Sequence, residues 1–206
     1  MGDYHDYVFD TENRKFIGRF EEMYENEEKN QYDSWFQDNL THITKRIAFS
    51  ILQDYNFSTI ADFGCGKGNF THLLKKKNNK IVGIDISNNA IKKARIRFPE
   101  LEWRVTNGSP DDFKCIISEL NWGMLDLTIC IEVLSYMEDW KKTISLISSF
   151  SRYAFFSVYL PDNPIGFIKS EAEFIAEVKA YFSPEVFLIN KTKENAIYFL
   201  GKKKSI

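Results

Sequence analysis

The chain has 206 residues, of which 44% are hydrophobic, so it can bury one core without disulfides or a structural metal. Its 27 Lys and Arg residues nearly balance 29 Asp and Glu residues, giving a formal charge of −2. This balance implies no basic surface large enough for a phosphate backbone, so nucleic acid is not expected as a partner.

The cysteines and the N-terminus indicate the compartment. Cys65, Cys115 and Cys130 show neither CxxC spacing nor a histidine close in sequence, so we expect no metal site and no disulfide framework. The first residues do not resemble a signal peptide, and no stretch approaches the roughly 20 apolar residues of a membrane span. We therefore expect a cytoplasmic monomer or homodimer without a membrane partner.

Residues 1–57 are predicted to form a helical N-terminal cap. Apolar and aromatic residues recur at helical spacing at Phe16, Phe20, Met23 and Tyr24. A second amphipathic stretch follows, from Trp35 to Ile51. No linker separates this region from the rest, so residues 1–206 are predicted to form a single domain.

Residues 58–206 alternate short apolar runs with longer amphipathic ones, which is typical of strand-helix repetition and a mainly parallel sheet. Seven strands are predicted, at Thr59–Phe63, Lys80–Ile84, Glu102–Thr106, Leu125–Ile131, Ala154–Tyr159, Glu185–Asn190 and Ala196–Leu200. Helices are predicted between them, at Asn69–Lys77, Asn88–Phe98, Asp111–Leu120, Asp139–Phe150 and Lys169–Tyr181. The predicted fold class is a three-layer α/β, Rossmann-like core.

The connection between the last two strands determines the direction of the final strand. Only residues 191–195 lie between them, which is too short for the helical crossover that parallel neighbours need. The final strand is therefore predicted to be antiparallel, in an otherwise mostly parallel sheet.

A glycine-rich turn follows the first strand of this core. The segment Asp62-Phe63-Gly64-Cys65-Gly66-Lys67-Gly68 joins an apolar strand to an amphipathic helix. Its glycines let the backbone turn sharply and approach a ligand, and the helix N-terminus offers unpaired N–H groups. The spacing is G-x-G-x-G, which differs from the G-x-G-x-x-G of dinucleotide binders and from a P-loop.

The second strand ends in Asp85, beside the glycine turn in a parallel sheet. A carboxylate at this place can accept hydrogen bonds from both hydroxyls of a ribose. Helix capping is the structural alternative, although Ser87 or Asn88 can also cap the next helix. The two motifs in this order favour a nucleoside-containing ligand.

Together these residues resemble the class I S-adenosylmethionine-dependent methyltransferases, from about Ser58 to Leu200. The resemblance implies a seven-stranded sheet with a reversed final strand, and S-adenosylmethionine as cofactor. It implies that Asp62, Gly64, Cys65 and Gly66 surround the methionine moiety, that Asp85 binds the ribose, and that Ile86 packs on adenine.

The resemblance also places Gly108 and Ile131 at the cofactor. The family often has an acid after the third strand that binds the adenine amino group, and Ser109 stands in its place here. Ser109, Asp111 or a backbone carbonyl are the alternatives for this contact. Cys65 and Cys130 are both expected beside the cofactor as small buried residues.

The fourth strand is followed by Glu132-Val133-Leu134-Ser135-Tyr136, which supplies the candidate catalytic residues. Glu132 either begins a helix or faces cofactor and acceptor. Family members commonly carry a histidine where Tyr136 stands, so this chain lacks that residue as a general base. Tyr136 either orients the acceptor or only packs.

Asp33-Ser34-Trp35 in the cap is similar to an Asp-Pro-Trp element of the nodulation N-methyltransferases, which act on sugar amines. Tyr32 and Trp35 could close over the sulfonium and the acceptor. The alternative is a hydrophobic staple that pins the cap. His5, His42 and His72 lack ligand spacing and are expected in surface or packing roles.

The predicted function is methyl transfer from S-adenosylmethionine to an oxygen or nitrogen of a small molecule, such as a sugar or cell-surface precursor. The alternative is a non-catalytic module that binds the cofactor or a nucleoside. The loop at residues 159–167 is expected to shape the choice of acceptor.

Overall fold

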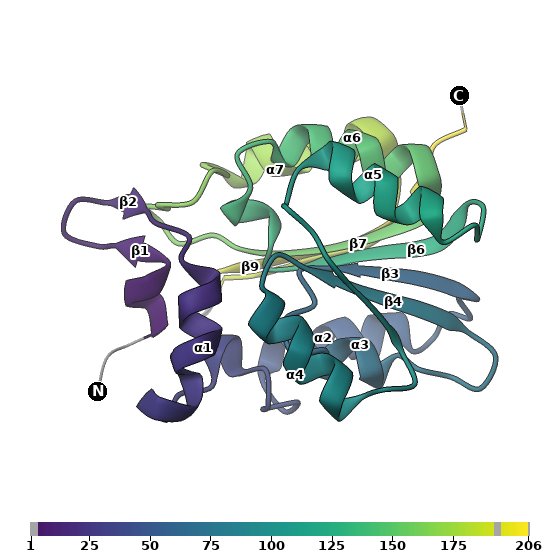
Figure 1. Ribbon diagram of the computed structural model, residues 1–206. Helices are drawn as coiled ribbons and strands as arrows, with labels where there is room; N and C mark the ends of the chain where they lie inside the picture. Colours follow the sequence, from purple (N-terminus) through teal and green to yellow (C-terminus); the bar gives the residue numbers. More distant parts are fainter. Residues whose placement is uncertain (1–3, 192–194, 206) are drawn as a thin grey trace.

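The computed structural model describes residues 4–191 and 195–205 and is dominated by one mixed sheet (Figure 1). In the described residues this sheet has seven strands: Thr59–Phe63 (β3), Lys80–Asp85 (β4), Glu102–Val105 (β5), Leu125–Ile131 (β6), Ser151–Tyr159 (β7), Phe182–Asn190 (β8) and Ala196–Lys203 (β9). Their order is β5-β4-β3-β6-β7-β9-β8. The seven predicted strands of the core are confirmed.

Strand β9 is the reversed strand of this sheet. It pairs antiparallel with both β7 and β8, whereas β3, β4, β5, β6 and β7 pair parallel. The predicted hairpin and antiparallel final strand are therefore confirmed, although residues 192–194 of its turn lie outside the described residues. Strand β8 begins at Phe182, and no loop separates it from helix α7 (Glu171–Tyr181).

Helices cover both faces of the sheet (Figure 1). One face carries α7 together with Pro110–Glu119 (α5) and Trp140–Phe150 (α6), and the other carries Ile43–Leu52 (α2), Asn69–Leu73 (α3) and Asn88–Arg97 (α4). Serine hydroxyls cap three of these helices: Ser87 accepts from the Ala90 N–H, Ser109 from Asp112 and Ser170 from Glu173. Each satisfies an N–H that the helix leaves unpaired.

Helix α3 is shorter than predicted. It ends at Leu73, and the lysines after it lie in a loop rather than on a helix end. The side chain of Asn79 stabilises this loop, since its Oδ1 accepts from the Lys76 N–H at 2.8 Å and its Nδ2 donates to the Leu74 carbonyl at 2.9 Å. A local side-chain bond therefore replaces the next helical turn.

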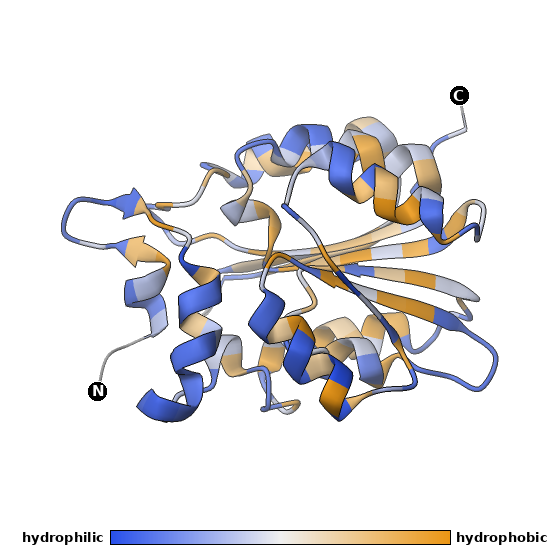
Figure 2. Ribbon diagram, in the orientation of Figure 1, coloured by the Kyte–Doolittle hydropathy of each residue, from blue (hydrophilic) through white to orange (hydrophobic). Residues whose placement is uncertain are grey.

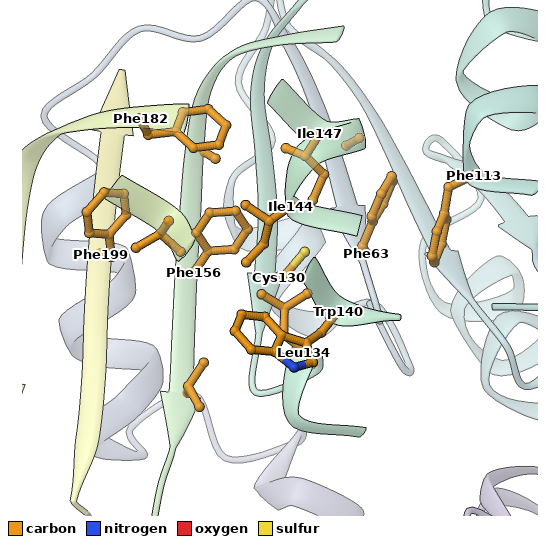
Figure 3. Packing of buried hydrophobic residues seen from close by; sticks show 14 of the residues in the cluster. Phe63, Phe113, Cys130, Leu134, Trp140, Ile144, Ile147, Phe156, Phe182 and Phe199 are labelled. Carbon is orange, nitrogen blue, oxygen red and sulfur yellow. The ribbon is translucent and has the colours of Figure 1, made fainter. Parts of the chain in front are cut away.

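The sheet has an apolar core on each side, and its strands contain many hydrophobic residues (Figure 2). The core beneath α5–α7 contains Phe63, Phe113, Ile144 and Phe156 (Figure 3). Cys130 is fully buried in that core, beside Ile144 (Figure 3). Side chains alternate across a strand, so Cys130 points into the core while its neighbour Ile131 reaches the cavity described below.

The part of the N-terminal cap before α2 lies at the end of the sheet where the parallel strands finish (Figure 1). The cap as a whole contains helices Phe20–Asn30 (α1) and α2, short 3₁₀ turns at Tyr4–Tyr7 and Ser34–Phe36, and a hairpin of Phe9–Asp10 (β1) and Lys15–Phe16 (β2). The hairpin was not predicted, and Phe16 lies in it rather than in the predicted helix. Its turn is formed locally, because the side chain of Asp10 binds the backbone and side-chain N–H groups of Asn13.

Among the described residues, no helix has the length and apolar character needed to cross a membrane.

Candidate active site

A cavity of about 440 Å³ opens between the cap and the carboxyl ends of β3, β4 and β6. This is the edge at which open parallel sheets bind ligands. Eleven of the residues predicted for the site line it: Trp35, Asp62, Gly64, Cys65, Asp85, Ile86, Gly108, Ser109, Ile131, Glu132 and Tyr136. Gly66 and Tyr32 do not.

The glycine turn packs tightly against the neighbouring strand and loop. The N–H groups of Gly64 and Cys65 both donate to the Ile84 carbonyl, at 2.7 and 3.1 Å. Gly64 has φ +76°, and a Cβ on it would overlap the side chain of Val133. Glycine is therefore required here both by conformation and by space.

Gly66 does not line the cavity, because the side chain of Gln37 from the cap packs against it. A Cβ on Gly66 would overlap the Gln37 amide. The Gln37 Oε1 accepts from the Lys67 N–H at 2.6 Å, and its Nε2 donates to the Tyr24 hydroxyl at 2.5 Å. Gln37 itself lines the cavity, so a residue of the cap contributes to the cavity wall beside the glycine turn.

Asp85 is buried at the end of β4 and is oriented by backbone donors. Its Oδ2 accepts from the Gly66 N–H at 2.8 Å and its Oδ1 from the Ser87 N–H at 2.9 Å. Burial raises the pKa of this carboxyl to about 6, although the backbone donors oppose the rise. Each oxygen retains a further lone pair, so the carboxylate can still accept hydrogen bonds from two ligand hydroxyls.

Asp62 lies deeper, at the end of β3. Its Oδ2 accepts from the Thr71 hydroxyl at 2.5 Å. Burial raises its pKa to about 7, and the negative charge of Asp85 adds to the rise. Two carboxyl groups with raised pKa values in one cavity are typical of a functional site.

A buried ionic network centred on Lys67 connects the glycine turn to the cap. Its ammonium lies 3.2 Å from a Glu27 carboxylate oxygen, 2.9 Å from Asp33 and 2.8 Å from Asp38. Lys93 also reaches Glu27, at 2.9 Å. The side chains of Lys67 and Glu27 are each only 5% exposed, so this pairing holds the cap directly over the turn.

The residues predicted from the resemblance to contact adenine, Ile86 and the segment after β5, line the cavity. Ile86 is 48% exposed and faces the cavity beside Gly108. The Ser109 hydroxyl caps α5, and Asp111 does not line the cavity. Asn107, which the sequence did not indicate, does line it.

Glu132 lies directly after β6 with φ +58°, an uncommon conformation for a residue with a side chain. Its N–H donates to the Ser157 carbonyl at 2.9 Å, and its Oε1 accepts from the Thr44 hydroxyl at 3.2 Å. The buried Tyr198 hydroxyl donates to Thr44 in turn, at 3.4 Å. The strained backbone and this chain of hydroxyls direct the Glu132 carboxylate into the cavity.

Tyr136 belongs to a cluster of aromatic side chains from the cap. Its ring lies parallel to Phe16 at 6.0 Å and packs on Phe9 and Phe20 at 5.8 Å and on Trp35 at 5.4 Å. This burial, with Glu132 nearby, raises the pKa of Tyr136 far above its usual range. Tyr136 therefore forms an apolar wall and cannot supply a phenolate at neutral pH.

The two cap aromatics predicted to cover the site separate in the structure. Trp35 lines the cavity, whereas Tyr32 packs outside it and donates its hydroxyl to the Met23 carbonyl at 2.7 Å. Residues 159–167 also lie outside the cavity wall. Phe167 of that loop packs on Phe16 at 5.5 Å, so the loop supports the hairpin instead.

Further lining residues from the cap were not predicted, namely Phe20, Tyr24, Gln37, His42, Thr44 and Lys45. They come from separate elements of the cap, so no local spacing marks them. His42 stacks on Phe36 at 4.9 Å. In the part of the chain that the structure describes, no cluster of His, Cys, Asp and Glu could hold a metal ion.

Comparisons with known proteins show a similarity to methyltransferases. Residues 61–151 match a family model described as a methyltransferase domain. No curated protein matches the chain in sequence.

Similar solved structures include three methyltransferases. N-methyltransferase NodS from Bradyrhizobium japonicum, in complex with S-adenosylhomocysteine, has 18% identity over 88% of this chain and 98% of its own, with a TM-score of 0.67. Magnesium protoporphyrin IX methyltransferase from Synechocystis has 16% identity, covers 82% and 83%, and has a TM-score of 0.61. A TehB-like S-adenosylmethionine-dependent methyltransferase from Corynebacterium glutamicum has 17% identity, covers 84% and 100%, and has a TM-score of 0.58.

The matched segment begins at the strand before the glycine turn and includes both Asp85 and Glu132. The fold as a whole is similar to the folds of these solved structures. Residues 61–151 are therefore similar to a methyltransferase domain, and the chain shares its fold with these methyltransferases.

Proposed function

We propose that the cavity binds S-adenosylmethionine along the glycine turn and transfers its methyl group to a small molecule, at nitrogen or oxygen. Asp85 binds the ribose hydroxyls, Ile86 packs on adenine, and Asp62 and Gly64 face the methionine moiety. The observation that carries this proposal is that the glycine turn, Asp85 and Glu132 line one cavity.

The composition of the other end of the cavity favours an amine as acceptor. Three carboxylate residues, Glu132, Glu138 and Asp139, line the cavity in and beside the segment that carries Tyr136. The aromatic side chains of Trp35 and Tyr136 face the same space. Acidic and aromatic groups together attract a cation, and a small-molecule amine is protonated at neutral pH. The similar structure of an N-methyltransferase supports this choice of an amine. A sugar amine is one acceptor of this class.

The chemistry requires little from the protein beyond orientation. The bound cofactor supplies a methyl carbon on a positively charged sulfur, which is already an activated leaving group. A protonated amine has no lone pair, so it would first have to lose a proton, which Glu132 would accept and release to solvent. The neutral nitrogen, held by Glu132, would then take the methyl group as the bond from that group to sulfur breaks, and Trp35 would exclude water.

A binding test and a turnover test on the intact chain examine this function. We expect saturable binding of S-adenosylhomocysteine by titration calorimetry, and a mass gain of one methyl group on an amine within a panel of amines, alcohols and carboxylates. Glu132→Gln should retain cofactor affinity and lose about 100-fold in kcat, as for a lost general base.

The outcomes separate the two hypotheses that the sequence allows. Binding without methylation of any acceptor would favour the non-catalytic module. Methylation of alcohols alone would overturn the amine assignment and leave the donor site intact. No binding of S-adenosylhomocysteine would overturn the cofactor site itself.

A further inference from the structure

Lys45 is a buried cation in the cavity wall that neither the donor site nor the acceptor site described above uses. It lies in the first turn of α2, is 7% exposed, and lines the cavity beside Thr44. It falls outside the matched segment of residues 61–151. A lysine buried in this way needs partners that compensate its lost hydration.

The partners of Lys45 are backbone carbonyls of the turn that carries Trp35. Its ammonium donates to the Phe36 carbonyl and, at 3.4 Å, to the Trp35 carbonyl. These hydrogen bonds bridge the beginning of α2 to a turn about ten residues earlier in the chain.

That turn has a backbone that needs support. Trp35 has φ +58° and Phe36 has φ +51°, so two consecutive bulky residues are in the left-handed region. Such residues cost free energy and persist only where surrounding contacts hold them. The conformation has a specific result, because it places the Trp35 ring 5.4 Å from Tyr136 and in the cavity wall.

We propose that Lys45 is a positioning residue, whose ammonium holds the Trp35–Phe36 turn closed over the acceptor end of the cavity. The carbonyl oxygens of Trp35 and Phe36 accept hydrogen bonds from this ammonium and so offset part of its lost hydration. The purpose of the closed turn rests on the proposed function, but the link between Lys45 and Trp35 does not.

The charged surroundings of Lys45 give this link a pH dependence. Burial lowers the pKa of Lys45 to about 8, while Asp33, Glu132 and Asp38 raise it and Lys67 lowers it further. His42, which precedes α2, lines the same cavity. Above about pH 8 the ammonium loses its charge, and its hydrogen bonds to the carbonyls weaken.

Fluorine NMR of protein labelled with 5-fluorotryptophan tests the link without any acceptor. The chain has four tryptophans, so four resonances are expected, and Trp35→Phe assigns the one from Trp35. In Lys45→Met we expect the Trp35 resonance to move while the other three stay in place. Lys45→Arg should keep it near the wild-type position, and Lys92→Met, an exposed lysine on α4, should change nothing.

A pH titration of the folded wild type gives a second readout if Lys45→Met does not fold. We expect the wild-type Trp35 resonance to shift near pH 8 toward its position in an open turn, and the Lys45→Arg resonance not to titrate there. An unmoved Trp35 resonance in folded Lys45→Met, or equal titration in wild type and Lys45→Arg, would overturn the proposal. Loss of S-adenosylhomocysteine binding in wild type would instead contradict the proposed function and leave this result unaffected.

Discussion

The proposed donor end and the proposed acceptor end of the cavity are assembled in different ways. The donor end comes mainly from one continuous stretch, Asp62 to Asp85, in which backbone hydrogen bonds join the glycine turn to β4. The proposed acceptor end combines Trp35 of the cap with Glu132 and Tyr136 from a distant part of the chain. Local backbone geometry therefore determines the donor end, whereas long-range side-chain contacts determine the acceptor end.

The ends also differ in how they are held. At the donor end the critical residues are glycines with no space for a side chain. At the acceptor end, non-glycine residues adopt left-handed conformations that hydrogen bonds and packing maintain. Substitutions should consequently act on cofactor affinity at one end and on turnover at the other.

The largest effect is expected at the glycine turn. Gly64→Ala places a Cβ against Val133 in a left-handed backbone and should abolish measurable S-adenosylhomocysteine binding in calorimetry, with about 2–4 kcal/mol lost from the free energy of unfolding. Gly123→Ala is the matched control, because Gly123 has φ +70° but no atom lies within 4 Å of where its Cβ would be. This variant should lower the free energy of unfolding by about 1 kcal/mol and leave the affinity for S-adenosylhomocysteine unchanged. Equal effects of both variants would contradict the close-packed turn.

The Lys67 network should give the next largest effect, on stability. Lys67→Met leaves Glu27 and Asp33 without this buried partner and should lower the free energy of unfolding by about 3 kcal/mol in urea titrations. The exposed Lys92→Met serves as control, with an expected change of less than about 0.5 kcal/mol. A change in Lys67→Met as small as in the control would show that the cap is held by apolar packing alone.

Cofactor affinity should fall as Asp85 becomes protonated. Its pKa is about 6, so affinity for S-adenosylhomocysteine should be constant above about pH 7 and decline below pH 6. Asp85→Ala should lower affinity about 100-fold at pH 8, corresponding to the loss of hydrogen bonds to a charged group. Calorimetry across this pH range measures both, and a flat wild-type profile would remove Asp85 as the ribose ligand.

The same pKa values set the stability of the ligand-free protein. Folding raises the pKa of Asp62 from 3.8 to about 7 and that of Asp85 from 3.8 to about 6. Between pH 3.8 and these raised values, the folded chain therefore binds more protons than the unfolded chain. Stability should therefore decrease as pH rises from about 4 to 7 through these two groups, and the loss should persist above pH 7. Asp62→Asn should be more stable than wild type at pH 8 in urea titrations, and a less stable variant would contradict this expectation.

The smallest effect is expected at Tyr136. Because its pKa is raised far above neutral, Tyr136→Phe should change kcat by about threefold at most, rather than the roughly 100-fold loss of a general base. A steady-state rate with the acceptor found by the panel measures this. A large loss in kcat with unchanged cofactor affinity would restore a direct role for the hydroxyl.

Local patterns in the sequence predicted much of the fold. The positions of Asp62 and Asp85 follow from apolar strands that end at one edge of a parallel sheet, and the short connection before β9 determined its direction. The same patterns missed the β1–β2 hairpin, because each of its strands has only two residues and shows no alternation. The same patterns also predicted that α3 continues to Lys77, because the hydrogen bonds made by the Asn79 side chain leave no periodic signal in the sequence.

The sequence by itself determined the residues of the proposed donor half, because a glycine turn and a carboxylate at a strand end follow from local backbone chemistry. Only the tertiary structure decided the acceptor half. It separated Tyr32 from Trp35, turned Cys130 into the core, and brought Lys45 to the Trp35–Phe36 turn. These placements depend on packing between segments distant in sequence, which no spacing within one segment records.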